Sequence, residues 1–167
     1  MNAPPKALVL DIDGVARTNS RDPNSPFYRI LRPHMSIIKP GVREAFEIII
    51  ALDIPFYIAT KQRGFSDGTL TQEAFEAMWQ EFKEKVIPIK FQHLTELFDR
   101  NLLVEPAAED KTVLFKIVVE RHPELKPSEI CAIDDSWGEI IAAKALGLDT
   151  YQTTNLYSTV LELFNLQ

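Results

Sequence analysis

Two aspartates separated by a single residue follow an apolar run near the start of the sequence, in "ALVLDIDGV". Residues 7–10 are typical of a buried strand, and Asp11 and Asp13 leave it on the same side because strand side chains alternate with a period of two. Two carboxylates this close repel each other unless a cation or a shared proton separates them. The pair therefore predicts one of these two arrangements at the end of the strand.

A second acidic pair, Asp134 and Asp135, ends another apolar run in "EICAIDD". Four acidic groups at one sheet edge need a compensating cation, and Mg²⁺ binds a few carboxylate oxygens while it keeps waters for a phosphate. One aspartate could then attack phosphorus while a neighbour moves a proton. The hydroxyl of Thr60 and the ammonium of Lys111 could hold the phosphate oxygens.

Alternating strand and helix patterns must position these groups. Strand patterns lie at residues 7–10, 54–60, 129–135 and 149–153, and helical patterns lie at 40–51, 71–86, 111–122, 136–146 and 155–164. Strands separated by helices predict an α/β fold, with a three-layer, Rossmann-like parallel sheet and helices on both faces. Ligands bind such sheets at the carboxyl ends of the strands, where the candidate acids and Thr60 fall.

Two stretches lack a regular pattern. Residues 16–39 are rich in proline, asparagine and serine, and we expect them to form a functional flap or a small hairpin. A flap here would lie over the site and help select the substrate. Arg17, Arg29 and Arg32 could meet a second anionic group there, although a solvated role is expected for any one of them. Residues 88–110 predict a less regular middle segment.

Length, composition and charge limit the kinds of protein and partner that this sequence allows. A chain of 167 residues, 46% hydrophobic and 25% charged, predicts a single domain over residues 1–167. The net charge of −6 and the lack of a basic cluster disfavour nucleic acid and anionic lipid as partners. No run reaches membrane-spanning length, and the single Cys131 excludes an internal disulfide. We expect a cytoplasmic monomer or small homo-oligomer.

The first acidic motif resembles that of the haloacid-dehalogenase superfamily of aspartate-nucleophile phosphohydrolases. The resemblance of "DIDGV" implies that Asp11 is the nucleophile and an Mg²⁺ ligand. It implies that Asp13 is the general acid/base, with its backbone carbonyl on the metal, and that Gly14 allows the tight turn beside the substrate. Thr60 fits the second motif of the family, a hydroxyl residue that ends the next strand.

The later motifs extend the resemblance to about residue 146. Lys111 fits the third motif, a basic residue at the start of a helix, and Lys116 is the alternative. Asp134 and Asp135 fit the fourth, which implies that both bind metal, that Asp135 is the main ligand and that Glu139 is a supporting acid.

Residues 60–78, "TKQRGFSDGTLTQEAFEAM", are similar to a segment of the heptose-bisphosphate and histidinol-phosphate phosphatases, which lack a large cap domain. Lys61 stands where that group usually has asparagine, and the cysteine loop that often binds zinc is missing. Substrate identity therefore does not transfer. Lys61 and Arg63, directly after Thr60, are candidates for substrate contact.

The leading hypothesis is a Mg²⁺-dependent phosphatase that hydrolyses a small phosphorylated metabolite through an aspartyl-phosphate on Asp11. One alternative keeps the chemistry and acts on 3'-phosphorylated nucleic-acid ends, which the acidic charge disfavours. Another is a catalytically silent relative that binds a ligand in the same pocket. A phosphomutase would need a separate cap, for which the chain has no room.

Overall fold

The computed structural model describes residues 3–18, 37–107 and 109–166. Five strands form one sheet in the order β3-β2-β1-β4-β5, and every neighbouring pair is parallel. Their bounds are β1 (Ala7–Leu10), β2 (Phe56–Lys61), β3 (Leu102–Glu105), β4 (Ile130–Asp134) and β5 (Asp149–Gln152). The predicted parallel α/β sheet is confirmed.

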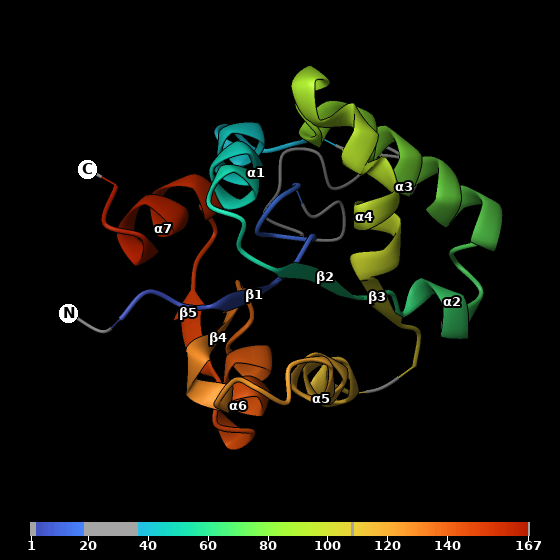
Figure 1. The fold of residues 1–167 in the computed structure, drawn as a ribbon. Coiled ribbons are helices and arrows are strands. Elements are labelled where there is room, and N and C mark those ends of the chain that lie inside the picture. Colours follow the sequence, from blue (N-terminus) through green and yellow to red (C-terminus); the bar gives the residue numbers. More distant parts are fainter. Residues whose placement is uncertain (1–2, 19–36, 108, 167) are drawn as a thin grey trace.

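Helices cover both faces of this sheet (Figure 1). They are α1 (Val42–Ala51), α2 (Gly64–Asp67), α3 (Gln72–Val86), α4 (Thr95–Asn101), α5 (Thr112–Arg121), α6 (Trp137–Ala145) and α7 (Leu156–Leu163). Short 3₁₀ turns lie at Ile89–Leu94 and Pro127–Glu129. Helices α1, α3, α4 and α7 pack on one face, and α5 and α6 pack on the other, which gives three layers.

Each central strand supplies side chains to both layers because its residues alternate between the faces. In β1, Leu8 and Leu10 enter the core under α1, whereas Ala7 and Val9 enter the core under α5 and α6. A strand buried on both sides reads as a continuous apolar run, which is why β1, β2 and β4 are recognisable in the sequence.

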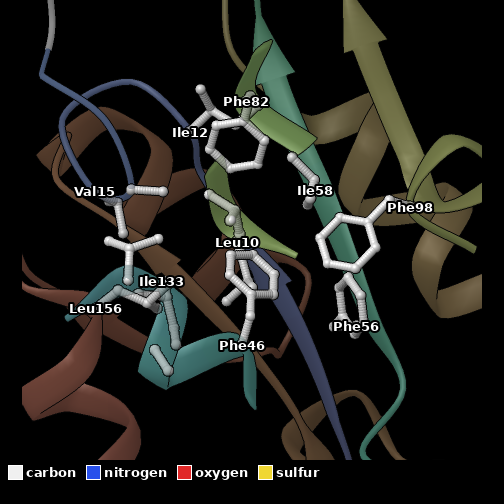
Figure 2. Packing of buried hydrophobic residues seen from close by; sticks show 14 of the residues in the cluster. Leu10, Ile12, Val15, Phe46, Phe56, Ile58, Phe82, Phe98, Ile133 and Leu156 are labelled. Carbon is white, nitrogen blue, oxygen red and sulfur yellow. The ribbon is translucent and has the colours of Figure 1, made fainter. Parts of the chain in front are cut away.

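Aromatic rings fill the larger core (Figure 2). The ring centroids of Phe56 and Phe98 lie 5.0 Å apart. The ring centroid of Phe46 lies 5.5 Å from that of Phe56 and 5.2 Å from that of Phe98. These side chains come from α1, β2 and α4, so their contact fixes both helices over the sheet. The same packing fixes the direction of β2, and therefore the position of Thr60 and Lys61 at its end.

Two elements lie where the sequence predicts an irregular segment. Strand β3 forms the edge of the sheet beside β2, and α4 precedes it. Only Leu103 of the strand is buried, so the segment carries neither a long apolar run nor a clear alternation. The prediction of an irregular middle segment was therefore wrong for residues 95–105.

Helix ends match the sequence in part. Thr71 caps α3 as predicted, because its side chain accepts a hydrogen bond from the Ala74 backbone N–H. Ser136 occupies the cap position of α6 but makes no capping hydrogen bond with its hydroxyl. Helix α1 begins at Val42, after Gly41, rather than at Pro40.

The predicted flap lies largely outside the described residues, and Arg29 and Arg32 fall in that part. Its two ends pair with each other. The Thr18 N–H donates to the Ile37 carbonyl at 2.9 Å, and the Lys39 N–H donates to the Ala16 carbonyl at 3.1 Å. The chain therefore leaves β1 and returns to α1 at the same place, beside the carboxyl end of the sheet.

Among the described helices, none combines the length and the apolar character needed to cross a membrane.

Candidate active site

Asp11 is the first residue after β1, and its carboxylate is buried. Its backbone N–H donates to the Ile133 carbonyl at 3.0 Å, which continues the contact between β1 and β4. The end of β4 therefore lies directly beside Asp11, and Asp134 is the last residue of that strand. The parallel sheet thus brings the early and late acidic motifs together, although 123 positions separate Asp11 from Asp134.

The ammonium of Lys111 lies between these two carboxylates. Its Nζ donates to Asp11 Oδ1 at 2.5 Å and to Asp134 Oδ2 at 2.7 Å, and its side chain is 4% exposed. Burial alone would lower the pKa of Lys111, but the charges of Asp11 and Asp134 outweigh it and raise the pKa. Lys111 is therefore a permanent cation in the site, whereas the alternative, Lys116, is exposed on α5.

Three of the predicted metal residues form one group. Asp11, Asp134 and Asp135 each offer a carboxylate oxygen, and these oxygens lie within 4.8 Å of one another. Burial, helped by the charges of Asp134 and Asp13, raises the pKa of Asp11 well above its ordinary range in spite of Lys111. Lys111 and the nearby Lys39 together leave these three acids short of positive charge. Closely spaced hard oxygens with excess negative charge fit Mg²⁺.

Gly14 lies against this group. Its backbone is left-handed, with φ of +93°, and a Cβ atom there would lie 2.0 Å from Asp135 Oδ2. Only glycine lets the turn after β1 approach Asp135 so closely, which agrees with the tight turn expected from the sequence. The ammonium of Lys39 donates to the Gly14 carbonyl and to the Thr154 carbonyl, the latter at 3.1 Å, so it also holds this turn.

The carboxylate of Asp13 has protein partners of its own and is not one of the three clustered acids. Arg17 Nε donates to its Oδ1 at 2.5 Å, and Gln62 Nε2 donates to its Oδ2 at 2.8 Å. Gln62 Nε2 also lies 2.8 Å from Thr60 Oγ1, so one amide connects the residues predicted as acid/base and as phosphate-binding hydroxyl. Metal binding by the backbone carbonyl of Asp13 stays a prediction.

Two of these positioning groups are not evident from the sequence. Arg17 is buried against Asp13, whereas a solvated side chain was the expectation. Gln62 follows Thr60 by two positions, and side chains two apart on an extended segment point to the same side. That spacing, and the place of Gln62 within residues 60–78, are the signals that could have identified it.

Lys61 and Arg63 bind protein groups in this structure. Lys61 forms an ion pair with Glu139 and donates to the Glu109 carbonyl at 2.8 Å. Arg63 donates to the same carbonyl at 3.2 Å. Their predicted contact with substrate stays a prediction. What the described residues do establish is that both hold the loop that leads into Lys111.

No family model matches the chain, and a search of curated proteins finds no match either. Solved structures do match. The D,D-heptose 1,7-bisphosphate phosphatase from B. bronchiseptica, solved with magnesium and phosphate, has a TM-score of 0.70 at 18% identity, over 94% of this chain and 86% of its own. The phosphatase of the same name from Burkholderia thailandensis has a TM-score of 0.65 at 19% identity, over 94% and 97%.

A haloacid-dehalogenase family hydrolase from Deinococcus radiodurans, with bound phosphate and sodium, is a more distant match. Its TM-score is 0.52 at 13% identity, over 97% of this chain and 89% of its own. At these identities the matches establish a shared fold. The fold that the sequence motifs implied is therefore confirmed, with little room in 167 residues for a separate cap domain.

Proposed function

We propose that this protein is a Mg²⁺-dependent phosphatase that hydrolyses a small phosphorylated metabolite through an aspartyl-phosphate on Asp11. The observation that carries the proposal is the contact of one buried lysine with Asp11 and Asp134, in a group of acids that Asp135 completes. The likeness in fold to a phosphatase crystallised with magnesium and phosphate supports it.

In the first step, a carboxylate oxygen of Asp11 attacks phosphorus, and the bond from phosphorus to the leaving oxygen breaks. Lys111 holds Oδ1, so Oδ2 is the oxygen for attack. Asp13 gives a proton to the leaving oxygen as the alcohol departs. Arg17 and Gln62 fix the orientation of Asp13 for this transfer.

In the second step, water attacks the phosphorus of the aspartyl-phosphate, and the bond to Asp11 breaks. Asp13 takes a proton from that water, which restores both side chains and releases inorganic phosphate. The hydroxyl of Thr60 and the ammonium of Lys111 hold phosphate oxygens as their charge changes. The hydroxyl of Thr60 can still donate because it accepts from Gln62.

Asp11, Asp134 and Asp135 would hold the metal, with the carbonyl of Asp13 as a further ligand. When bound, Mg²⁺ neutralises the acidic cluster and polarises the phosphoryl group toward attack.

The Asp11→Asn variant tests the proposal directly, because an amide cannot act as the nucleophile. We expect its turnover of an aryl phosphate in Mg²⁺ to fall by about 10³-fold or more, with the circular dichroism spectrum unchanged. Asp53→Asn is the matched control, since Asp53 is exposed at the end of α1 with a left-handed backbone that asparagine tolerates. Full activity in Asp11→Asn would overturn the proposal.

The substrate class needs a separate comparison. We expect Mg²⁺-dependent phosphate release from sugar phosphates to exceed release from 3'-phosphorylated oligonucleotides, because a net charge of −6 disfavours a polyanion. If the protein preferred the oligonucleotide, the proposed chemistry on Asp11 would stand, but the proposal of a small metabolite as substrate would be overturned. No hydrolysis of any phosphate ester would favour the catalytically silent alternative.

A further inference from the structure

The backbone that carries Lys111 is held by an acid from another helix. Lys111 lies just before α5, and its N–H donates to Glu139 Oε2 at 2.7 Å. Glu139 is in the first turn of α6 and is 3% exposed. This hydrogen bond sets where the chain enters α5, and therefore the point from which the lysine side chain reaches Asp11 and Asp134.

The second oxygen of Glu139 has a partner on the sheet. Glu139 Oε1 forms an ion pair with Lys61, the last residue of β2. Lys61 also donates to the Glu109 carbonyl at 2.8 Å, within the loop that leads to Lys111. The ammonium of Lys61 therefore holds both Glu139 and the loop next to Lys111.

Because Glu139 is buried, its ion pair with Lys61 is needed to keep the loop before α5 in place. A carboxylate as buried as Glu139 is strongly unfavourable without a compensating charge, and breaking such a pair destabilises its surroundings far more than breaking an exposed one. Lys61 can supply that charge from a fixed place, because β2 pairs with β1 on one side and with β3 on the other.

We propose that Lys61 is a positioning residue that acts through Glu139 on the catalytic Lys111, rather than a substrate contact. The expected effect on turnover rests on the proposed function. The contacts that connect Lys61, Glu139 and the Lys111 backbone concern only the fold of the loop before α5. Loss of the Lys61 charge releases Glu139, which loosens the N–H anchor of Lys111 and moves its ammonium relative to Asp11.

A double-mutant cycle of Lys61→Met and Glu139→Gln tests this linkage. Hydrogen exchange of the Lys111 amide, read from peptides that cover residues 106–115, is the first readout and needs no activity. We expect exchange to be about tenfold faster in either variant. Lys61→Met should have a smaller effect once Glu139 is glutamine, because only the hydrogen bond from Lys61 to the Glu109 carbonyl is then left to lose. Unchanged exchange in Lys61→Met, or fully additive effects, would overturn the proposal.

Turnover gives the second readout, with an aryl phosphate and a sugar phosphate as substrates. A misplaced Lys111 should lower kcat about 10- to 100-fold by the same factor for both substrates, whereas a lost substrate contact would change KM and differ between them. Lys61→Arg keeps the ion pair and should keep most of the turnover. A loss confined to KM for the larger substrate would assign Lys61 to substrate binding instead.

The control is Lys6→Met, the same substitution in an exposed ion pair between Lys6 and Glu129 at the other end of β1. It should leave exchange at Lys111 and turnover unchanged. If Lys61→Met does not fold, the test compares Lys61→Arg with Glu139→Gln. Lys61→Arg should keep the Lys111 amide protected from exchange, whereas Glu139→Gln should expose it to faster exchange. If the wild-type protein hydrolyses no phosphate ester, the proposed function fails while the exchange cycle still decides the linkage.

Discussion

At the scale of single residues, the three clustered acids differ in how the protein compensates them. Asp134 accepts hydrogen bonds from Lys111 Nζ and from the Ser136 N–H at 2.7 and 2.9 Å. Within residues 3–18, 37–107 and 109–166, no side chain donates a hydrogen bond to the Asp135 carboxylate. Burial and the neighbouring Asp134 raise its pKa, although Lys111 and Lys39 act in the opposite direction. Of the pair Asp134 and Asp135, Asp135 is therefore the acid that a bound cation would relieve more.

This difference predicts opposite effects of two similar substitutions in metal-free protein. Asp135→Asn removes a repelling charge and should raise Tm by a few degrees, equivalent to about 1 kcal/mol. Asp134→Asn removes an acceptor of Lys111 and should lower Tm. Mg²⁺ should raise Tm of the wild type and raise that of Asp135→Asn much less. Thermal melts with and without Mg²⁺ measure all three changes, and equal Mg²⁺ shifts would contradict the role of Asp135.

The gain from Asp135→Asn should depend on pH in a defined direction. Because the folded pKa of Asp135 is raised, the repulsion is fully present at neutral pH, where the carboxylate is ionised in both states. As the pH falls through the folded pKa, the native protein takes up a proton and the repulsion is relieved. The two Tm values should therefore converge in acid.

The sequence could identify the acids and Lys111 because each follows or precedes a recognisable strand or helix. It did not identify the partners of Asp13, although the spacing of Gln62 from Thr60 is a signal for one of them. Arg17 reaches Asp13 only because the chain turns back after β1, and Gln62 reaches it from the neighbouring strand. The contact of Arg17 depends on the shape of a loop, which residue spacing does not determine.

At the scale of elements, the least predictable part of the fold is the one that supports the loop before Lys111. Strand β3 is a short edge strand with one buried residue, and α4 is only seven residues long. Both lack the long periodic pattern that identified β1, β4 and α3. Tertiary contacts must hold them in place, and the link from α3 to α4 is the clearest of these.

Asp99 of α4 makes that link. It accepts hydrogen bonds from Lys83 Nζ at 2.6 and 2.9 Å and from Trp79 Nε1 at 2.7 Å, both on α3. Burial raises the pKa of Asp99, but these hydrogen bonds outweigh it and lower the pKa below its ordinary value. The ionised carboxylate therefore stabilises the contact between the helices at neutral pH.

Asp99→Asn should lower the free energy of unfolding at pH 7 by about 1 kcal/mol, a modest value because solvent screens this half-exposed carboxylate. Since the folded pKa is lowered, the stabilisation is present above the unfolded pKa and is lost as the pH falls through the folded one. Urea unfolding at pH 7 and below pH 3 measures the effect. Glu120→Gln, at an exposed position of α5, is the control and should show no loss. If the free energy of unfolding of Asp99→Asn stayed below that of the wild type in strong acid, the charge of Asp99 would not be the source of the difference.

At the scale of the whole molecule, Cys131 provides a probe of how cooperatively the sheet opens. It is the second residue of β4, which lies between β1 and β5, and it is 1% exposed in the core under α1 and α7. Burial, with a smaller effect of Asp149, raises the pKa of its thiol to about 12. The native thiol is therefore both covered and protonated, so an alkylating reagent can reach it only after the central strands separate.

We expect iodoacetamide to label Cys131 at pH 8 only through unfolding, so that the free energy from labelling equals the one from urea unfolding. The double variant Cys131→Ala with Ser128→Cys, whose new thiol is exposed, should label at the rate of a free thiol. Mg²⁺ at 100 times its Kd should slow labelling of Cys131 about 100-fold, since it binds only the folded site. Asp135→Asn should remove most of that protection. Labelling that is fast in native buffer and insensitive to Mg²⁺ would mean that β4 opens independently of the acidic site. The site at the ends of the strands and the core beneath it would then not form one cooperative unit.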